Sequence, residues 1–372
     1  MSAHNPEEQH VTPVQKAAAA LNANNIDALL VGPGPDLSAL SGWHTHPMER
    51  LTGLLVTKSG DASIILPRME YPGFQSNTFD PSITPLIWDE QHGPWDKVAE
   101  ALGSIGAETT IAIGQHLWGQ YVVDLVHRFP GVHLAHGGPI MQPVRQVKTD
   151  DEIAKLRAAG AAIDRVHQRM GEVLKVGRTE KEVAKEIDRM MREEGHSVAE
   201  FIIVGAGENG ASPHHSPTDR VINEGEAVVV DIGGPVDHYF SDCTRNYVMG
   251  HAPEGYDEAY RVLQASQAAG CAAVRPGIRA GEIDRICRSI IIDGGYGEYL
   301  LHRTGHGIGL EVHEDPYIFE SNDTLLEPGM AFSVEPGIYK PGEWGMRIED
   351  IVACTKEGGE RLNTTSTDYV VL

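Results

Sequence analysis

The order of hydrophobic and polar positions in the first part of the chain alternates between two patterns. Short apolar runs rich in Val, Ile and Leu predict strands at residues 27–32, 50–57, 62–67 and 109–114. Apolar positions three and four residues apart predict helices at residues 14–25, 95–106 and 121–129. Because strands that alternate with helices are typical of α/β folds, we predict a small α/β domain over residues 1–146.

A different organisation begins at residue 147. Thr149 and Glu152 have the spacing of a capping box, and apolar residues follow them at helical intervals. A second capping box, formed by Thr179 and Glu182, begins the next predicted helix. We therefore predict that a second domain occupies residues 147–372 and begins with these two helices.

The second domain carries a faint internal repeat. Residues 175–195 and 275–295 align at an offset of one hundred, with matching glycines. The strand-like runs 224–234 and 327–337 also correspond, and each carries a carboxylate near its end. These matches predict two related α-plus-β halves that share one sheet.

A carboxylate at the end of an apolar strand needs a partner. The run VVVD ends at Asp231, and burial of an unpaired carboxylate is very costly. The residues that follow have a hairpin pattern with a turn at 235–238. If the turn centre lies between Val236 and Asp237, Asp231 faces Asp242 with the Cβ atoms ~5 Å apart. Like charges this close repel one another unless a cation joins them.

The second half repeats this arrangement. A loop centred on Gly342 places Glu335 opposite Glu349. The segment HRTGHGIGLEVHE, residues 302–314, adds histidines, and its glycines argue against a helix there. Four carboxylates and one histidine suit hard or borderline divalent ions, and four negative charges match two such ions. The site would resemble a two-metal hydrolase centre, with the ions ~3.5–4 Å apart.

The chain resembles the pita-bread metallopeptidases, the group of prolidase, aminopeptidase P, methionine aminopeptidase and creatinase. Five motifs carry the resemblance, in the order VDIGG, SDCTR, HRTGHGIGLEVHE, VEPGIY and RIED. The resemblance covers residues 147–372, whereas residues 1–146 resemble the creatinase-type N-terminal domain less closely, through GPGPDLSALSGW. Methionine aminopeptidases generally lack that domain, which sets this subgroup aside. The resemblance implies an α+β protein, with a C-terminal pita-bread fold of pseudo-twofold α/β halves after a smaller creatinase-like α/β domain.

The resemblance also implies five metal ligands. Asp231 would bind one ion alone, whereas Asp242 and Glu349 would bridge both ions. His306 and Glu335 would hold the other ion. Mn²⁺ fits this set of ligands well, and Co²⁺, Zn²⁺ or Fe²⁺ are alternatives because the affinity order alone does not decide among them.

Four residues have implied catalytic roles. Glu335 would take the proton of the attacking water and pass it on. His214 would contact the substrate, although its neighbour His215 competes for this assignment. His313 would hydrogen-bond the substrate or the developing oxyanion. Arg347 would orient the bridging carboxylate that lies two residues after it.

Three more residues are candidates for substrate binding. His302 is either a substrate contact or a hydrogen-bonded structural histidine. His44 would reach the active site of a partner subunit, or it lies in a surface loop. Tyr317 stands where some prolidases carry an arginine that holds the carboxylate of the dipeptide. Arg303 and Arg50 are the candidates to replace that arginine.

The implied reaction is metal-dependent hydrolysis of the Xaa-Pro peptide bond by a prolidase-like dipeptidase. Because Tyr317 departs from the prolidase pattern, an aminopeptidase P that acts on longer Xaa-Pro-Xaa peptides is the alternative. A metal-dependent hydrolase of C–N bonds in small molecules is a third candidate. The complete set of metal ligands argues against a non-catalytic scaffold protein.

Composition narrows the partners further. Acidic residues number 53 and basic residues 30, and the formal charge of −23 argues against nucleic acid or an anionic membrane as a partner. The four cysteines form no CxxC pair, and the first residues lack the pattern of a secretory signal. We therefore expect a cytoplasmic protein. The expected partners are proline-containing di- or oligopeptides and, by the resemblance, a second copy in a homodimer.

Overall fold

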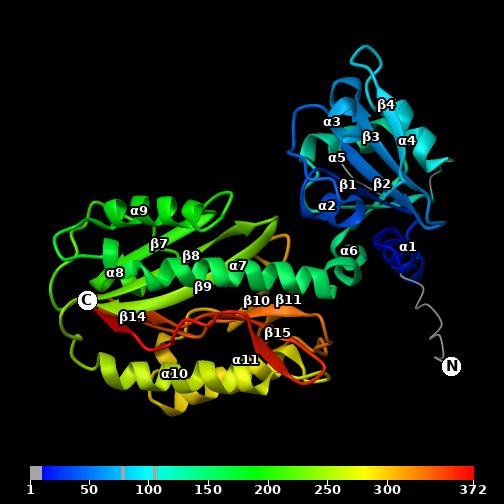
Figure 1. The fold of residues 1–372 in the computed structure, drawn as a ribbon. Coiled ribbons are helices and arrows are strands. Elements are labelled where there is room, and N and C mark those ends of the chain that lie inside the picture. Colours follow the sequence, from blue (N-terminus) through cyan, green and yellow to red (C-terminus); the bar gives the residue numbers. More distant parts are fainter. Residues whose placement is uncertain (1–10, 77–79, 104–105, 107) are drawn as a thin grey trace, which may run out of the picture. The chain divides into compact units, whose positions relative to one another are not determined.

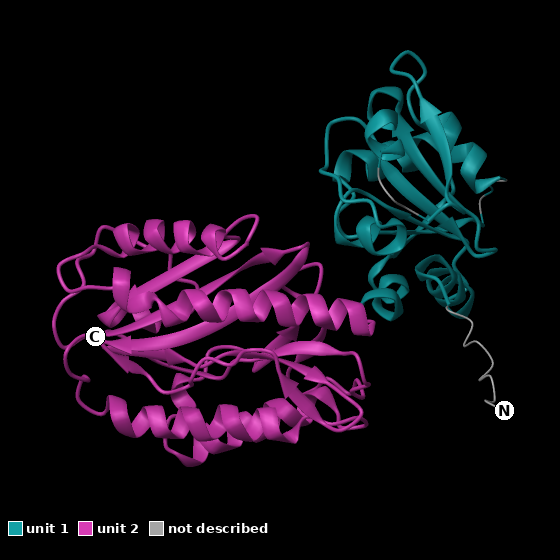
Figure 2. Ribbon diagram, viewed as in Figure 1, with its two compact units in different colours: residues 1–145 teal, residues 146–372 magenta. Residues whose placement is uncertain are grey.

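The computed structural model of the chain describes residues 11–372 except 77–79, 104–105 and 107. The chain divides into two compact units, residues 1–145 and residues 146–372 (Figure 2). Among the described residues, none of the helices combines the length and the apolar character that crossing a bilayer requires.

The first unit is built on a six-stranded sheet with the order β4-β3-β2-β1-β5-β6. Its strands are β1 (Ala28–Val31), β2 (Gly53–Thr57), β3 (Ala62–Pro67), β4 (Thr84–Trp88), β5 (Thr110–Ile113) and β6 (His133–His136). The helices are α1 (Pro13–Ala23), α2 (Pro35–Ser41), α3 (Tyr71–Gln75), α4 (Trp95–Leu102), α5 (Gly119–Arg128) and α6 (Gly138–Arg145). A short 3₁₀ helix, η1 (Arg68–Glu70), precedes α3. Strands β1, β2 and β3 pair antiparallel, and the remaining pairs are parallel.

The predicted α/β character of this unit is confirmed. All four predicted strands and all three predicted helices form, although residues 104–105 of the predicted helix at 95–106 lie outside the described residues. Sequence reasoning missed α2, η1, α3, β4, β6 and α6. Strand β6 has mostly exposed side chains, so its sequence shows no apolar run.

The second unit contains five α-helices within its described residues: α7 (Asp150–Gln168), α8 (Met170–Val173), α9 (Glu180–Glu193), α10 (Tyr256–Ala273) and α11 (Ala280–Asp293). Both predicted capping boxes are present. Thr149 accepts a hydrogen bond from the backbone of Glu152 at the start of α7, and Thr179 accepts one from Glu182 at the start of α9. These caps satisfy N–H groups that the first helical turn leaves free.

Three sheets make up the strand layer of this unit. One sheet has the order β17-β9-β8-β7, with β7 (Phe201–Ala206), β8 (Ala227–Val236), β9 (Tyr239–Val248) and β17 (Val370–Val371). The second has the order β11-β10-β12-β15-β16, with β10 (Gly305–Gly307), β11 (Glu314–Ile318), β12 (Ala331–Val334), β15 (Asp350–Cys354) and β16 (Gly359–Arg361). The third pairs β13 (Gly337–Lys340) with β14 (Trp344–Arg347). The prediction of one shared sheet is therefore wrong, because backbone pairing breaks between the two halves.

The predicted internal repeat is confirmed. Helices α9 and α11 begin and end one hundred residues apart. Gly177 and Gly277 precede them with φ of 88° and 82°, a left-handed conformation that favours glycine. The N–H of Gly177 donates to the carbonyl of Ile222, and that of Gly277 donates to the carbonyl of Leu326. The two halves thus repeat the same turn, the same helix and the same backbone contact.

The strands of the second unit lie between two layers of helices (Figure 1). Helices α7 and α9 pack on β7, β8 and β9 through a core that includes Ile163, Ile187 and Val230. Helices α10 and α11 cover the other half through Leu263 and Ile283. The strand layer is thereby shielded on both faces, so polar side chains that point into it are buried.

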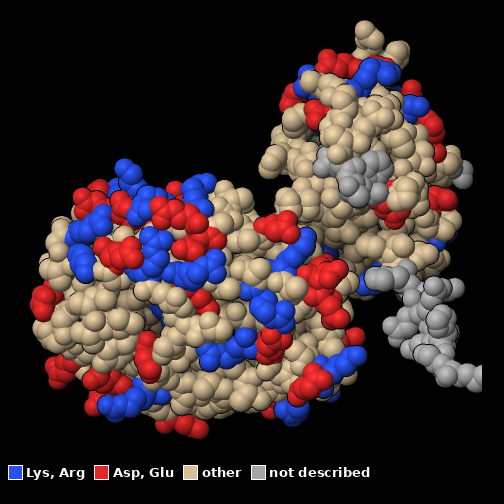
Figure 3. Space-filling model, viewed as in Figure 1, with Lys and Arg blue, Asp and Glu red and all other residues tan. Residues whose placement is uncertain are grey.

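The surface over α9 mixes both signs of charge (Figure 3). Arg189 pairs with Glu186 at 3.0 Å, and Arg192 pairs with Asp188 at 3.2 Å. Exposed pairs of this kind add little to stability, but they keep the surplus of acidic residues from forming a single-sign field on this face.

Candidate metal centre

The first carboxylate pair lies on the hairpin of β8 and β9. Asp231 pairs with Thr244, and Asp242 pairs with Gly233, so the predicted register, which set Asp231 directly opposite Asp242, is wrong by two residues. The turn lies at Asp237 and His238, which have positive φ of 47° and 70°. A shift of two residues keeps side chains on the same face of the sheet. Asp231 and Asp242 are therefore diagonal neighbours on one face, within reach of a common ligand.

The second pair lies between two short ladders of the other half. Val334 pairs with Asp350, and Gly337 pairs with Arg347, so both ladders share one register. The predicted hairpin centred on Gly342 is confirmed. Glu335 and Glu349 stand in the gap where the strand pairs separate, and Glu349 is only 1% exposed.

His306 lies on β10, the strand whose glycines flank it. A Cβ at Gly305 would clash with the carbonyl oxygen of Ser333, and one at Gly307 would clash with the carbonyl oxygen of Asp315. Only glycine allows β10 to lie this close to its neighbours. The backbone is therefore held where the imidazole of His306 can reach the carboxylates.

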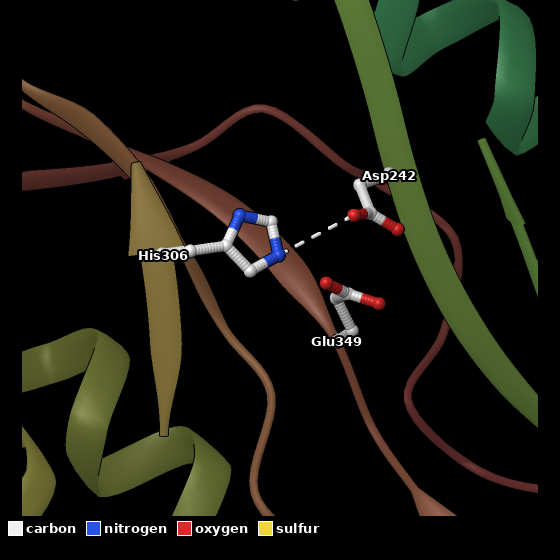
Figure 4. A group of neighbouring side chains, drawn as sticks. All are labelled: Asp242, His306 and Glu349. Atoms are coloured by element: carbon white, nitrogen blue, oxygen red, sulfur yellow. Dashed lines mark ion pairs between the residues drawn. The ribbon is translucent and has the colours of Figure 1, made fainter. Parts of the chain in front are cut away.

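The imidazole of His306 has one nitrogen for the backbone and one for the cluster. Its Nδ1 lies 3.1 Å from the carbonyl oxygen of Gly307. Its Nε2 lies 3.1 Å from Glu335 Oε1 and 3.5 Å from Asp242 Oδ2. Figure 4 shows the ring pointing from β10 toward Asp242, with Glu349 beside that carboxylate. The ligand atoms of Asp242, His306 and Glu349 lie within 4.8 Å of one another.

Three buried oxygen atoms of this cluster have no hydrogen-bond donor among the described residues. They belong to three of the four carboxylates on the two hairpins: Asp231 Oδ1, Asp242 Oδ1 and Glu349 Oε1. A buried carboxylate oxygen without a donor is strongly destabilised. A cation at this position would supply the missing partner, so the donor set fits divalent metal ions.

The buried carboxylates of the cluster repel one another, and this repulsion changes their pKa values. Burial, together with repulsion from Asp231 and Glu335, raises the pKa of Asp242 well above its usual range. Burial and repulsion from Asp242 likewise raise the pKa of Glu349. For Glu335, burial opposes ionisation, but the hydrogen bond with His306 and nearby positive charge lower its pKa to about 2. Glu335 is therefore a carboxylate at neutral pH.

Arg347 links two of the carboxylates through hydrogen bonds. Its Nη2 lies 2.5 Å from Asp231 Oδ2, and its Nε donates to Thr244 Oγ1 at 3.0 Å. Thr244 in turn donates to Glu349 Oε2 at 2.7 Å. Arg347 thus contacts Asp231 directly and reaches Glu349 through Thr244. Sequence reasoning overlooked Thr244, although its position two residues after Asp242 marks the same strand face.

A cavity of about 870 Å³ opens over these carboxylates. Its polar lining includes His214, His302 and His313, and its apolar lining includes Phe201 and Ile203 of β7. The structure thus brings three of the predicted substrate-binding or catalytic histidines to one cavity with the metal ligands.

The cavity histidines have distinct surroundings. The rings of His306 and His313 meet edge to face with centroids 4.0 Å apart. Enclosure by the cavity and the proximity of His306 lower the pKa of His313 to about 4. His302 Nε2 lies 2.7 Å from the hydroxyl of Tyr339, and burial lowers its pKa as well. Both imidazoles are therefore neutral at neutral pH, and each keeps one N–H donor.

The adjacent residues His214 and His215 separate in space. His215 Nε2 lies 2.8 Å from Glu180 Oε2, whereas the side chain of His214 is exposed in the cavity. Glu180 was not a candidate in the sequence, because nothing in its local pattern distinguishes it from the other acidic residues at the start of a helix.

Two candidates for substrate binding are not among the residues that line the cavity. Tyr317 is not among the cavity-lining residues; the guanidinium carbon of Arg303, which does line the cavity, lies 4.2 Å from the centre of its ring. His44 is an exposed residue of the first unit. Its neighbour Trp43 is buried against Phe74 with ring centroids 5.2 Å apart.

Comparison with known proteins accounts for both units. The profile of metallopeptidase family M24 matches residues 154–356, and that of the creatinase/prolidase N-terminal domain matches residues 13–147. The chain belongs to metallopeptidase family M24. This membership implies divalent metal ions, in agreement with the buried carboxylates and histidine of the cluster.

Full-length relatives share this organisation. The chain is 42% identical over 358 residues to "Probable dipeptidase PepE" of Mycobacterium tuberculosis, covering 96% of this chain and 95% of the relative. It is 34% identical over 364 residues to the Xaa-Pro dipeptidase of Lactobacillus delbrueckii subsp. lactis, covering 95% and 96%. The crystal structure of dipeptidase PepE from Mycobacterium ulcerans superposes with a TM-score of 0.90 at 40% identity, covering 96% of each chain. The α+β architecture, with an N-terminal creatinase-like domain and a C-terminal pita-bread domain, is thereby confirmed.

Proposed function

We propose that this metallopeptidase hydrolyses the Xaa-Pro bond of dipeptides with two divalent metal ions, best supplied as Mn²⁺. The observation that carries the proposal is the cluster of buried carboxylate oxygens without donors at the floor of a cavity lined by histidines. The relatives named dipeptidase and Xaa-Pro dipeptidase support the choice of substrate.

Five residues would hold the two ions. Asp231 would bind one ion, His306 and Glu335 the other, and Asp242 and Glu349 would bridge both. Bound divalent ions would supply a water of lowered pKa and polarise the scissile carbonyl. The low pKa of Glu335 leaves this residue ionised and able to accept the proton of the attacking water. Glu335 then delivers that proton to the prolyl nitrogen as the C–N bond breaks.

The histidines of the cavity serve the substrate. With a pKa of about 4, His313 is neutral at neutral pH and donates one N–H to the carbonyl oxygen on which negative charge develops. His214, which also lines the cavity, contacts the substrate. His302, bonded to Tyr339, holds its part of the wall in place. The apolar side chains of β7 offer a surface to the proline ring.

We assign the carboxylate of the dipeptide to Arg303. Arg303 lines the cavity, and its guanidinium forms no ion pair among the described residues. Arg347 already donates hydrogen bonds to Asp231 and Thr244. Arg50, in the first unit, is paired with Glu49 and Glu90. Arg303 is therefore the cation best placed to favour a dipeptide over a longer chain.

The test compares substrates after removal of metal. The enzyme is treated with EDTA, Mn²⁺ is restored, and hydrolysis of Gly-Pro and of Gly-Pro-Gly is measured. The proposal expects Mn²⁺-dependent cleavage of Gly-Pro. Cleavage of the tripeptide alone would make the enzyme an aminopeptidase P, and cleavage of neither would favour a metal-dependent C–N hydrolase of small molecules.

We further propose that the enzyme is a cytoplasmic homodimer in which His44 reaches the cavity of the partner. The four cysteines are buried and unpaired, as expected in a reducing compartment. Light scattering would give the oligomeric state. If His44 acts across a dimer, His44→Ala and a monomeric variant should both lose activity, and a fully active monomer would contradict this role.

A further inference from the structure

Glu180 is a fully buried carboxylate outside the metal cluster. It is the first residue of α9, and its exposed fraction is 0%. A buried carboxylate stays ionised only when donors surround it. Burial opposes ionisation of Glu180, but hydrogen bonds from its neighbours hold its pKa below the usual range. The start of a helix also favours a negative charge.

Five hydrogen bonds converge on this carboxylate, and all of them come from the loop of residues 206–218, which here includes the last residue of β7 and the 3₁₀ helix η2 (Gly207–Ala211). Oε1 accepts from the backbone N–H of Ala206 at 3.0 Å and from Asn209 Nδ2 at 2.9 Å. Oε2 lies 2.8 Å from His215 Nε2 and accepts from the N–H and the hydroxyl of Thr218 at 3.0 and 2.7 Å. The loop of residues 206–218 is thus attached to one side chain at its beginning and near its end.

His214 lies between the two attachment points. The same loop contributes Pro213, His214 and His215 to the wall of the cavity. On its other side, the carbonyl of Pro213 accepts a hydrogen bond from Arg347 Nη1 at 3.5 Å, so the loop also contacts the residue behind the metal ligands. The loop is held between Glu180 and Arg347, and the exposed side chain of His214 takes its position from that backbone.

The internal repeat shows that the fold itself does not require this carboxylate. In the second half, the residue at the matching position, one hundred residues later, is Ala280, the first residue of α11. Ala280 is also buried, and α11 begins with the same turn and the same backbone contact. The helix start that both halves share therefore forms with alanine in one half and glutamate in the other. Because an alanine side chain has no hydrogen-bond acceptor, the contacts that Glu180 makes to residues 206–218 belong to the first half alone.

We infer that Glu180 is a positioning residue that fixes the loop of residues 206–218, and through it His214, against the substrate cavity. The inference rests on the proposed function for its catalytic consequence, but not for the ordering of the loop. Glu180 acts through His215, Asn209 and Thr218 and does not contact the substrate.

The first experiment measures the loop directly. Hydrogen–deuterium exchange is compared between the Mn²⁺-loaded wild type and Glu180→Gln, with metal content measured for each. A glutamine amide would present N–H donors to groups that now donate to Oε1 or Oε2. The inference expects exchange at least about tenfold faster in residues 206–218, with metal content retained. Unchanged exchange in this loop would overturn it, whether or not the enzyme cleaves any peptide.

The second experiment asks whether the effect reaches His214. We expect Glu180→Gln to lower kcat/KM for the better substrate by about 10–100-fold, the scale for a misplaced catalytic contact. In a His214→Ala background, the same substitution should cost less than about threefold, because the group that it positions is already absent. Equal losses in both backgrounds would show a general structural effect and overturn the inference. Glu180→Asp, which keeps the charge, should recover part of the loss.

The control substitution is Glu152→Gln. Glu152 accepts hydrogen bonds from Thr149 and from the hydroxyl of Tyr239, and it has no bond to the loop. It should leave exchange in residues 206–218 unchanged. The two proposals can fail separately. If the loop exchanges faster in Glu180→Gln but the wild type cleaves no Xaa-Pro substrate, the positioning role is supported and the proposed function is refuted.

Discussion

The guanidinium of Arg303 lies over the ring of Tyr317, with 4.2 Å between the guanidinium carbon and the ring centre. Stacking of this kind orients the plane of the guanidinium while its N–H groups remain available at the edge. Two residues that look unrelated in the sequence thereby form one unit at the cavity wall, an oriented cation.

This unit predicts a preference for free carboxylates. Hydrogen bonds to a charged group contribute about 1.5–3 kcal/mol, or roughly 10–100-fold in binding. Arg303→Met should therefore lower the ratio of kcat/KM for Gly-Pro to that for Gly-Pro amide by about this factor, mainly through KM. Tyr317→Phe keeps the ring and should keep the ratio, whereas Tyr317→Leu should lower it in part. An unaltered ratio in Arg303→Met would remove Arg303 from this role.

The position of Thr244 behind a metal ligand predicts that its hydroxyl strengthens metal binding. Its hydroxyl is the link between Arg347 Nε and Glu349 Oε2. Loss of a partner that orients a ligand typically costs about 10–100-fold in metal affinity or activity. Thr244→Val should weaken Mn²⁺ binding by this factor, measured by calorimetric titration. Thr57→Val, in the first unit, is the matched control, and equal affinities in the two variants would contradict the assignment.

The raised pKa values of Asp242 and Glu349 predict how the metal-free protein responds to pH. Folding holds protons on these carboxyls above the pH at which the unfolded chain releases them. Their contribution to stability is thus complete below the ordinary carboxyl range near pH 4 and is lost as pH rises toward the raised values. Each group changes the free energy of unfolding by at most about 1.4 kcal/mol per pH unit.

Denaturant unfolding between pH 5 and pH 8 would measure this dependence. The metal-free wild type should lose more stability over this range than the metal-free double variant Asp242→Asn/Glu349→Gln, which has no proton to lose at these positions. Mn²⁺ should reverse the trend, because the metal binds the deprotonated form. A metal-free wild type whose stability changes in parallel with that of the double variant would be inconsistent with the raised pKa values.

The buried ion pair of Lys148 and Glu314, next to His313 in the sequence, is expected to stabilise the fold. Lys148 Nζ lies 2.5 Å from Glu314 Oε1, and the two side chains are only 2% and 6% exposed. Removal of one partner of a buried ion pair costs about 3–5 kcal/mol, because the other charge stays buried without the ion that balanced it. Lys148→Met should lower the free energy of unfolding by this amount. Lys148→Met/Glu314→Met should recover most of it, and a double variant as unstable as the single one would count against this account.

The elements that could be predicted are those with local signals. Capping boxes, strand-like apolar runs and the repeat at an offset of one hundred specified α7, α9 and α11 and most of the first unit. The family motifs identified the five expected ligands, and all five line one cavity in the structure. The register of β8 and β9 was missed because Asp237 and His238 take the positive φ angles that a glycine usually marks.

The supporting contacts could not be predicted in the same way. Thr244 meets Glu349 across 105 positions of sequence, and Glu180 meets Thr218 across 38. Such hydrogen bonds depend on how elements distant in sequence pack together, so no local residue pattern predicts them. Within the second half, the ladder of β12 and β15 is separated from that of β13 and β14 at Glu335 and Glu349. The backbone N–H groups of these two residues donate instead to the carbonyls of Thr304 and Thr244, which are distant in sequence.

The central claim is that the buried carboxylates and His306 form a two-metal hydrolytic centre. The most direct measurement is a titration of the EDTA-treated enzyme with Mn²⁺, with bound metal and Gly-Pro hydrolysis recorded on the same samples. The account predicts that two ions bind per chain, that activity rises with occupancy to its maximum at two, and that His306→Ala loses one ion together with nearly all activity. Full activity of the metal-free enzyme, or of His306→Ala with one ion bound, would contradict it.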